Sequence, residues 1–287
     1  MSVFVQYGKV GKPIVYNTLP TASEDLKGVC GQVEDKIYIC DGSNWNVFSN
    51  TTLKKLLDIT KSTYCLFDHY QGASVDDLIA YDDTENVTNF AATFQSCFKL
   101  IKAPLLNMSK ANSCNAMFNQ CNALTYIPLY DTSAITNMNY FLEGCIMLEN
   151  IPLFNTSNVK KMEYMFRDCK KLSTIPHFDT SNVTTMTAIF YGCSSLTTVP
   201  ALDVSNVVYF GDCFFDCSSL KSILMTGMKA NFNISVSTKF EQSDLVTILN
   251  NLATVTTTKT LTMGATNLAK LTDEEKAIAT NKGWTLA

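Results

Sequence analysis

A cysteine recurs every 24 residues through the middle of this 287-residue chain. Because the whole sequence holds only 11 cysteines, five successive hits at one spacing have a chance probability of roughly one in ten million. A leucine stands three residues after each of these cysteines, and a phenylalanine or leucine stands three residues before. The spacing therefore identifies an internal repeat. The repeating cysteines are Cys97, Cys121, Cys145, Cys169, Cys193 and Cys217.

Each repeat is expected to form one coil of a solenoid. The clearest copy, residues 178–200, places its apolar residues at steps of three and four, which predicts a short helical or 3₁₀ segment with one buried face. Val199 precedes Pro200, and a residue before proline favours an extended conformation. One coil would thus contain a short strand, a turn and a short helix. A single coil cannot bury its own apolar face, so the coils are expected to stack.

The repeat motif TSNVxxMxxxFxxCxxLxxIP resembles the BspA-like leucine-rich repeat of bacterial surface proteins and of phages of gut bacteria. The resemblance covers residues 85–226 and implies an α/β repeat solenoid of six copies. Its end copies depart from the motif, with Phe90 in place of the methionine in the first and Leu224 in place of the proline in the sixth. Such departures are typical of terminal repeats, because these face solvent on one side.

The repeating cysteines have three possible roles: disulfides, metal ligands or core packing. The array contains no paired CxxC spacing and no CxxC with a nearby histidine, which argues against metal. Stacked strands lie ~4.8 Å apart, which is within reach of a disulfide, but equivalent side chains of stacked coils run parallel instead of facing each other. We therefore expect the thiols to pack as small hydrophobic groups in a core that folds in a reducing compartment.

Composition excludes several classes of function. Lys and Arg number 22 against 26 Asp and Glu, a net charge of −4, which gives no basic field for nucleic acid or anionic membranes. No stretch reaches the ~18 uninterrupted apolar residues that a membrane-spanning helix needs. The N-terminus also lacks the basic start, apolar run and cleavage site of a secretory signal. We expect a soluble protein that is not exported by that route.

The segments before the repeats are predicted to form a β-module and a cap. In residues 1–50, short apolar runs alternate with turn pairs such as Asp41-Gly42, which predicts a small β-meander. Residues 51–84 are predicted to form a helical cap that covers the first coil. The stretch LPTASEDLKGVCGQVEDKIYICDGSNWNVF resembles a β-module near the start of phage head-fibre and tail-fibre proteins. This second resemblance implies attachment to a virion.

Residues 227–287 are predicted to close the array as an α/β C-terminal cap. An apolar stripe predicts a helix over 243–252, and the segment KTLTMG predicts a strand. A capping box at 272–275 opens a further helix, which Gly283 is expected to end before a last short strand.

The sequence offers no catalytic chemistry. It contains no GxSxG, HExxH, Walker or GxGxxG motif in a suitable context, and His69 and His177 fall in different structural units. The acidic or amide residue that recurs before the Thr-Ser pair, as at Asp131 and Asp179, could suggest an ion ladder, but we expect it to bond local backbone amides. The chain is accordingly predicted to be non-enzymatic, with no cofactor and no metal.

Binding is the better-supported function, because a solenoid presents one broad face of variable side chains. A locally basic copy beside aromatic residues could contact an anionic or sugar-bearing partner, although a solvated charged face is the alternative. The candidate partner-binding residues are Tyr126, Tyr140, Tyr164, Lys160, Lys161, Arg167, Lys170 and Lys171.

The two resemblances together imply a structural protein of a bacteriophage virion, a head-fibre, tail-fibre or decoration protein assembled in the bacterial cytoplasm. Its expected partners are other virion proteins through the N-terminal module, further copies in a trimer, and a glycan or protein of the host surface. The alternative is a bacterial cell-surface adhesin of the BspA-like repeat type whose export signal is missing from the sequence.

Overall fold

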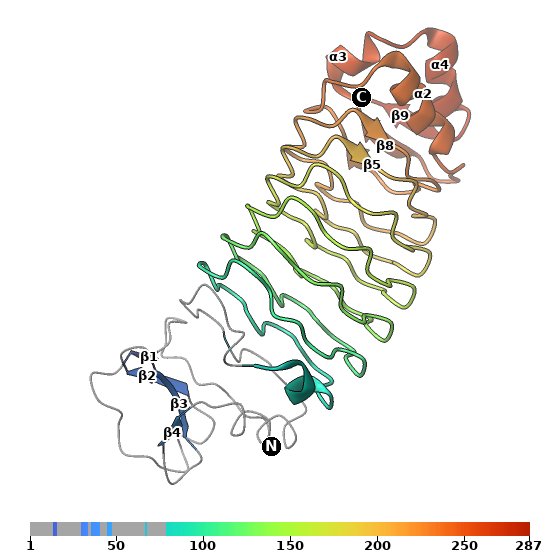
Figure 1. Ribbon diagram of the computed structural model, residues 1–287. Helices are drawn as coiled ribbons and strands as arrows, with labels where there is room; N and C mark the ends of the chain where they lie inside the picture. Colours follow the sequence, from blue (N-terminus) through green and yellow to red (C-terminus); the bar gives the residue numbers. More distant parts are fainter. Residues whose placement is uncertain (1–13, 16–29, 34–35, 41–44, 48–66, 68–78) are drawn as a thin grey trace.

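A computed structural model describes residues 14–15, 30–33, 36–40, 45–47, 67 and 79–287 of the chain. Its middle part is a stack of similar coils that ends in a group of helices at the C-terminus (Figure 1). No helix among these residues is long and apolar enough to cross a membrane. Most of the helical cap predicted at 51–84 lies outside the described residues, and the part that is described holds a short 3₁₀ helix, η2, at Tyr81–Thr84.

The strands of the N-terminal module form one four-stranded sheet. Strands β2 (Cys30–Val33), β3 (Lys36–Cys40) and β4 (Trp45–Val47) pair antiparallel in sequence order, as expected for a β-meander. Strand β1 (Ile14–Val15) adds to β2 in parallel, which the sequence pattern did not predict.

In the array, the segment before each repeating cysteine is a run of six turn residues and not a helix. Within every run the backbone has a positive φ five residues and one residue before the cysteine, as at Tyr164 (59°) and Asp168 (57°). The N–H groups alternate between two kinds of acceptor. The N–H of Arg167 closes a turn on the carbonyl of Tyr164 at 3.1 Å, whereas the N–H of Phe166 donates to Ile189 of the next coil at 3.0 Å. These turn runs are 91–96, 115–120, 139–144, 163–168, 187–192 and 211–216.

The expectation of one short helix in every coil was therefore wrong, and residues 85–226 contain no α-helix. An α-helix would need right-handed φ values throughout and would keep its N–H groups within the segment. In the turn runs, every second N–H instead donates a hydrogen bond to a carbonyl of the next coil, and these bonds link the coils as the hydrogen bonds of a β-sheet link its strands. A repeat fold is present, but its α/β character is confined to the C-terminal cap.

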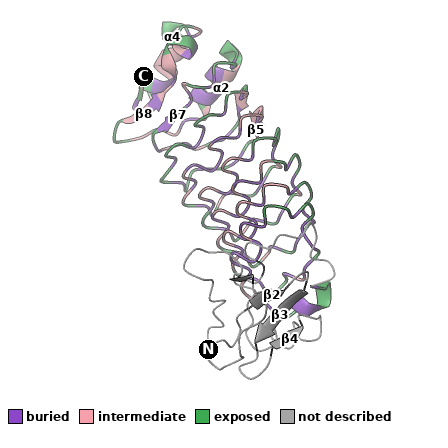
Figure 2. Ribbon diagram, turned by 90° about the vertical axis from the view of Figure 1, so that its left-hand side faces the viewer, coloured by how far each residue is buried: buried purple, intermediate pink, exposed green. Residues whose placement is uncertain are grey.

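Parallel bridges join the coils at two further places. In the first column, the residue that stands eight before each repeating cysteine forms a bridge with its equivalent 24 residues further on. Examples are Asn137 with Lys161 and Lys161 with Thr185. The second column follows the cysteine, where β5 (Thr198–Val199) pairs in parallel with β6 (Ser222–Ile223). In Figure 2, buried and exposed stretches alternate along every coil, so each coil contributes one layer of a continuous core.

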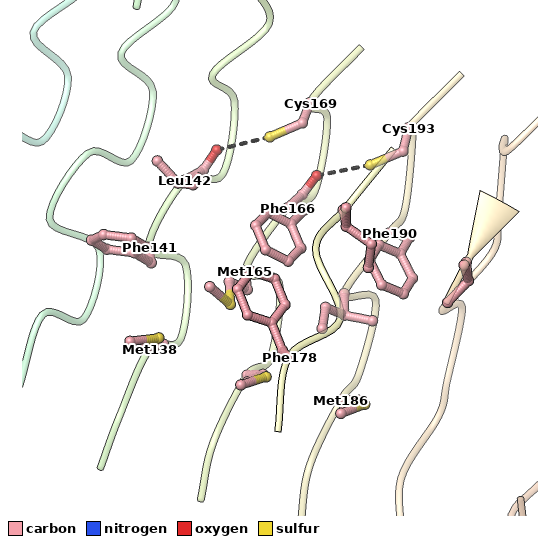
Figure 3. Packing of buried hydrophobic residues seen from close by; sticks show 14 of the residues in the cluster. Met138, Phe141, Leu142, Met165, Phe166, Cys169, Phe178, Met186, Phe190 and Cys193 are labelled. Carbon is pink, nitrogen blue, oxygen red and sulfur yellow. Dashed lines mark hydrogen bonds between the residues drawn. The ribbon is translucent and has the colours of Figure 1, made fainter. Parts of the chain in front are cut away.

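Phenylalanine rings stack from coil to coil in this core. Phe166, Phe190 and Phe214 follow one another with ring centroids 6.0 Å apart. The third copy replaces the stacked ring with Leu142 and compensates with the neighbouring Phe141, which packs edge-on against other rings (Figure 3). Such close packing of complementary shapes is typical of protein interiors.

The repeating cysteines are more than small hydrophobic groups. The Sγ of each one donates to a backbone carbonyl 27 or 30 residues earlier in the chain, as from Cys193 to Phe166 at 3.0 Å and from Cys169 to Leu142 at 3.2 Å (Figure 3). The eight cysteines between residues 97 and 217 are buried and free of disulfides. The thiol therefore gives a buried carbonyl a second donor while filling an apolar site.

The C-terminal cap continues the stack with regular elements. Strands β7 (Phe232–Asn233), β8 (Lys259–Thr262) and β9 (Trp284–Leu286) form a parallel sheet. The helices are α2 (Gln242–Asn251), α3 (Gly264–Leu268) and α4 (Asp273–Thr280). The predicted capping box is confirmed, because the Thr272 hydroxyl accepts from the Glu275 N–H at 3.2 Å and the Glu275 carboxylate accepts from the Thr272 N–H at 2.8 Å. Helix α3 was not predicted.

Candidate binding surface

The polar residues of the TSN motif and the acidic residue before it form hydrogen bonds within their own turn or to the neighbouring coil. Asp131 accepts from the Ser133 N–H at 3.1 Å, and hydrogen bonds from that serine lower the pKa of the Asp131 carboxyl. The buried Thr156 hydroxyl donates to the carbonyl of Asp179 in the next coil at 2.7 Å. The acidic residues of the motif thus bond local backbone, as predicted, and the motif is architectural.

Aromatic side chains from successive coils meet on the outer side of the turn runs. Tyr140 and Tyr164 occupy the left-handed position five residues before the cysteine, and their rings stack at 4.8 Å with an angle of 5°. The guanidinium carbon of Arg167 lies 5.7 Å from the centroid of the Tyr164 ring and 4.8 Å from that of Tyr191. Arg167 thus contacts aromatic rings on two coils, an arrangement that stabilises a cation.

A second line of contacts runs through the residues two before each repeating cysteine from Cys121 to Cys217, and we call these five residues the surface ladder. The Asn119 amide donates to the Glu143 carboxylate at 2.6 Å, and Glu143 lies 3.5 Å from the Arg167 guanidinium. Arg167 covers Tyr191, whose ring stacks on Phe215 at 4.8 Å. The surface ladder therefore couples five consecutive coils through side chains alone.

The charges in the surface ladder are partly shielded from water. Burial raises the pKa of Glu143, and the nearby Arg167 and the Asn119 amide oppose that rise. Among the residues that the structure describes, the buried Nε of Arg167 has no hydrogen-bond partner, and it lies 3.6 Å from the carboxylate of Asp168. The ladder is polar at one end and aromatic at the other.

Comparison with known proteins assigns the family. The profile of the family described as "Mycoplasma protein of unknown function, DUF285" matches residues 34–127, 60–174 and 112–228, which overlap and together cover more than half of the chain. This chain belongs to the DUF285 family. No curated protein matches the sequence significantly. Among solved structures, a leucine-rich repeat protein of T. pallidum aligns with a TM-score of 0.42 and 16% identity, over 66% of this chain and 79% of that chain.

The structure of this DUF285 protein separates the eight predicted binding residues. Ring contacts bring together Tyr140, Tyr164 and Arg167, whereas the other five lie elsewhere on the coils. Lys160 and Lys161 are exposed near the first bridge column, and Lys170 and Lys171 follow Cys169, with Lys171 3.3 Å from Glu149. Tyr126 is 54% exposed in the second bridge column, where it pairs with Lys102.

The sequence analysis missed part of the exposed surface of the DUF285 array. Tyr191 and Phe215 extend the surface ladder, and the signal for them was their spacing of 24 and 48 residues from Arg167. The exposed surface also includes a column of leucines that stand eight residues after the cysteine in three successive coils, and we call it the leucine column. These leucines are Leu105, Leu129 and Leu153, which are 55–62% exposed.

Among the described residues, no group of three or more His, Cys, Asp or Glu side chains is arranged to hold a metal ion. His177 is exposed and occupies the same position as the leucine column in the next coil, eight residues after Cys169. Its ring Nε2 contacts the carbonyl of Ala201.

Proposed function

We propose that this DUF285 protein is a non-enzymatic structural or binding protein that displays a BspA-like leucine-rich repeat solenoid of six 24-residue coils. One observation carries the proposal. The residues that recur along the array, in all or most of the copies, are engaged inside it in thiol, hydroxyl and amide bonds between coils, whereas the variable positions form the surface ladder outside. A rigid repeat with a variable outer face is suited to holding partners.

For the biological setting we propose a fibre or decoration protein of a bacteriophage virion. The support is the pairing, in one chain, of a module resembling the start of phage fibre proteins with a repeat array. In this setting the N-terminal module attaches to other virion proteins, the chain assembles as a trimer, and the array faces a glycan or protein of the host surface. The second candidate is a bacterial cell-surface adhesin, which the bacterial description of the DUF285 family favours.

Immunogold electron microscopy separates the two settings. Antibody raised against the full chain is applied to purified phage particles from the source culture and to the envelopes of uninfected cells. The virion proposal predicts gold on capsids or tails, and absorption of the antibody with recombinant protein should abolish that label. Label restricted to the envelopes of uninfected cells would reject the virion setting and support the adhesin.

A further inference from the structure

The last turn run, residues 211–216, lacks the neighbour that all the earlier runs have. In the preceding coil, the N–H groups of Ala188 and Gly192 donate to Gly211 and Phe215 at 2.8 Å each. The equivalent groups of the last run, on Asp212 and Asp216, have no hydrogen-bond acceptor anywhere in the described part of the chain, and the same holds for the N–H groups that precede each of them by two residues.

This edge presents donors only. The intervening N–H groups are used within the run, as from Phe215 to the carbonyl of Asp212 at 3.2 Å, and the carbonyls of Gly211 and Phe215 accept from the preceding coil. An ordinary β-strand offers both donors and acceptors along its edge. The edge at Asp212 and Asp216 therefore needs a partner that brings acceptors.

Residues around this edge are more exposed than their equivalents in the preceding coil. Tyr209 is 64% exposed and Phe215 is 46% exposed, and Asp212 and Asp216 are also in the exposed class. Their counterparts one coil earlier, at 185, 188, 191 and 192, are half-buried or buried. The following chain covers only the inner side of the run, where the Phe232 ring packs 6.4 Å from that of Phe214.

Phe215 also ends the surface ladder. One side of its ring stacks on Tyr191 at 4.8 Å, and no other ring or cation contacts it within the described ranges. The exposed carboxylates of Asp212 and Asp216 come from the two left-handed positions of the same run, with φ values of 54° and 57°. We call Tyr209, Asp212, Phe215 and Asp216 the end platform.

The chemistry of the end platform decides between occupants. A second copy docking through the same edge would set donors against donors and carboxylates against carboxylates. A β-strand would bring carbonyls for the free donors but also N–H groups of its own, and no backbone acceptor stands opposite those along this edge. An anion would be repelled by two carboxylates, and a cation would leave the N–H groups unused. Sugar hydroxyls both accept and donate, and the apolar face of a sugar ring can cover an aromatic ring.

We propose that the end platform binds a neutral saccharide, with a sugar ring over the free face of Phe215, sugar oxygens accepting from the N–H groups of Asp212 and Asp216, and sugar hydroxyls donating to their carboxylates. The inference deepens the proposed binding function and rests on it, because it names the ligand class and the place on the array that receives it.

The test uses the full chain and immobilised neutral polysaccharides, namely amylose, mannan, galactan and chitin oligomers, followed by titration of the soluble fragment of whichever binds. Phe215→Ala and Asp216→Asn are each expected to weaken binding at least about tenfold. Phe98→Ala is the matched control, because Phe98 is an exposed phenylalanine of similar exposure, 44%, outside the end platform. It should leave the affinity unchanged.

Hydrogen exchange of the backbone amides gives an independent readout. The saccharide should protect the amides of Asp212 and Asp216 in the wild type and not in Phe215→Ala. Absence of binding to all four polysaccharides, or equal affinity of Phe215→Ala and wild type, would overturn the proposal. So would protection of these amides by a bound polypeptide in place of the sugar. Gold label on virions remains a separate result, so the site can fail while the proposed function stands.

Discussion

Raising the pH above about 9 should unfold this protein over a narrow range, because so many thiols are buried. Burial raises the pKa of the Cys217 thiol to about 12 and also raises the pKa of the other six well above the ordinary value. These seven thiols are Cys114, Cys121, Cys145, Cys169, Cys193, Cys213 and Cys217. In the unfolded chain a thiol ionises with a pKa of about 8.5.

The sign and size of the effect follow from proton linkage. Above pH 8.5 or so the folded state holds more protons than the unfolded state, so the free energy of unfolding falls as the pH rises. Stability is complete below the unfolded pKa and is lost progressively toward the raised folded values. Each buried thiol contributes a loss of about 1.4 kcal/mol per pH unit. Seven give about 10 kcal/mol per pH unit, which is comparable to the whole stability of a typical protein, about 5–15 kcal/mol.

The assay is urea unfolding in the presence of a reductant, followed by circular dichroism at a series of pH values from about 7 to 9.5. Cys169→Ala and Cys193→Ala should each lower the free energy of unfolding at neutral pH and should each reduce its alkaline slope by about 1.4 kcal/mol per pH unit. Lysine and tyrosine side chains are present equally in wild type and variants, so their titration cancels in the comparison. Identical slopes for the wild type and for both variants would refute the reasoning.

Two further predictions concern packing and backbone. Phe190→Leu should lower the free energy of unfolding by about 2–4 kcal/mol, since it removes three buried carbons and the ring contacts with two stacked partners. Adding Ile189→Phe reproduces the arrangement of the third copy and should recover most of that loss. A double-mutant cycle measured by urea unfolding tests this, and strictly additive effects of the two substitutions would contradict it. Gly192→Ala, at a φ of 72° and with its new Cβ against the Asp168 carboxylate, should lower stability by about 1–2 kcal/mol, whereas Gly211→Ala, where the nearest atom is 4.0 Å away, should stay within about 0.5 kcal/mol.

Features encoded locally were predictable from the sequence, as the C-terminal cap illustrates. The capping box at Thr272 and Glu275 and the positive φ of Gly283, three residues after the last helix ends at Thr280, depend on residues within one or two turns of each other. The 24-residue spacing likewise required only one observation repeated along the chain. Helix α3 has five residues, which is too short for an apolar period to appear.

The turn runs were mistaken for helices because both place apolar residues at steps of three and four. The distinguishing signal was the residue just before the cysteine, which is Gly144, Asp168, Gly192 or Asp216 in four of the copies. Glycine and aspartate are among the residues that tolerate a positive φ, and a left-handed residue in every fourth position is incompatible with an α-helix.

The binding surface was only partly predictable for a different reason. Tyr140 and Tyr164 occupy the same position in adjacent copies, five residues before the cysteine, so their ring contact follows from the repeat itself. Arg167 shares its slot with Tyr191 but also contacts Tyr164 in a different slot, and the period alone does not specify that second contact. The open edge at Asp212 depends on where the array stops, which is a property of the whole fold.

The way the array ends follows from the same hydrogen bonds that build it. A turn run depends on the next coil for the acceptors of every second N–H, so any run that comes last leaves a row of donors unpaired. A helix keeps its N–H groups within itself. The chain therefore changes from turn runs to helices α2 and α4 when it leaves the repeat. The N–H groups that this change leaves without acceptors all lie at one place, the outer edge of residues 211–216. Because that edge remains exposed, it is the part of the array with unused bonding capacity for a partner.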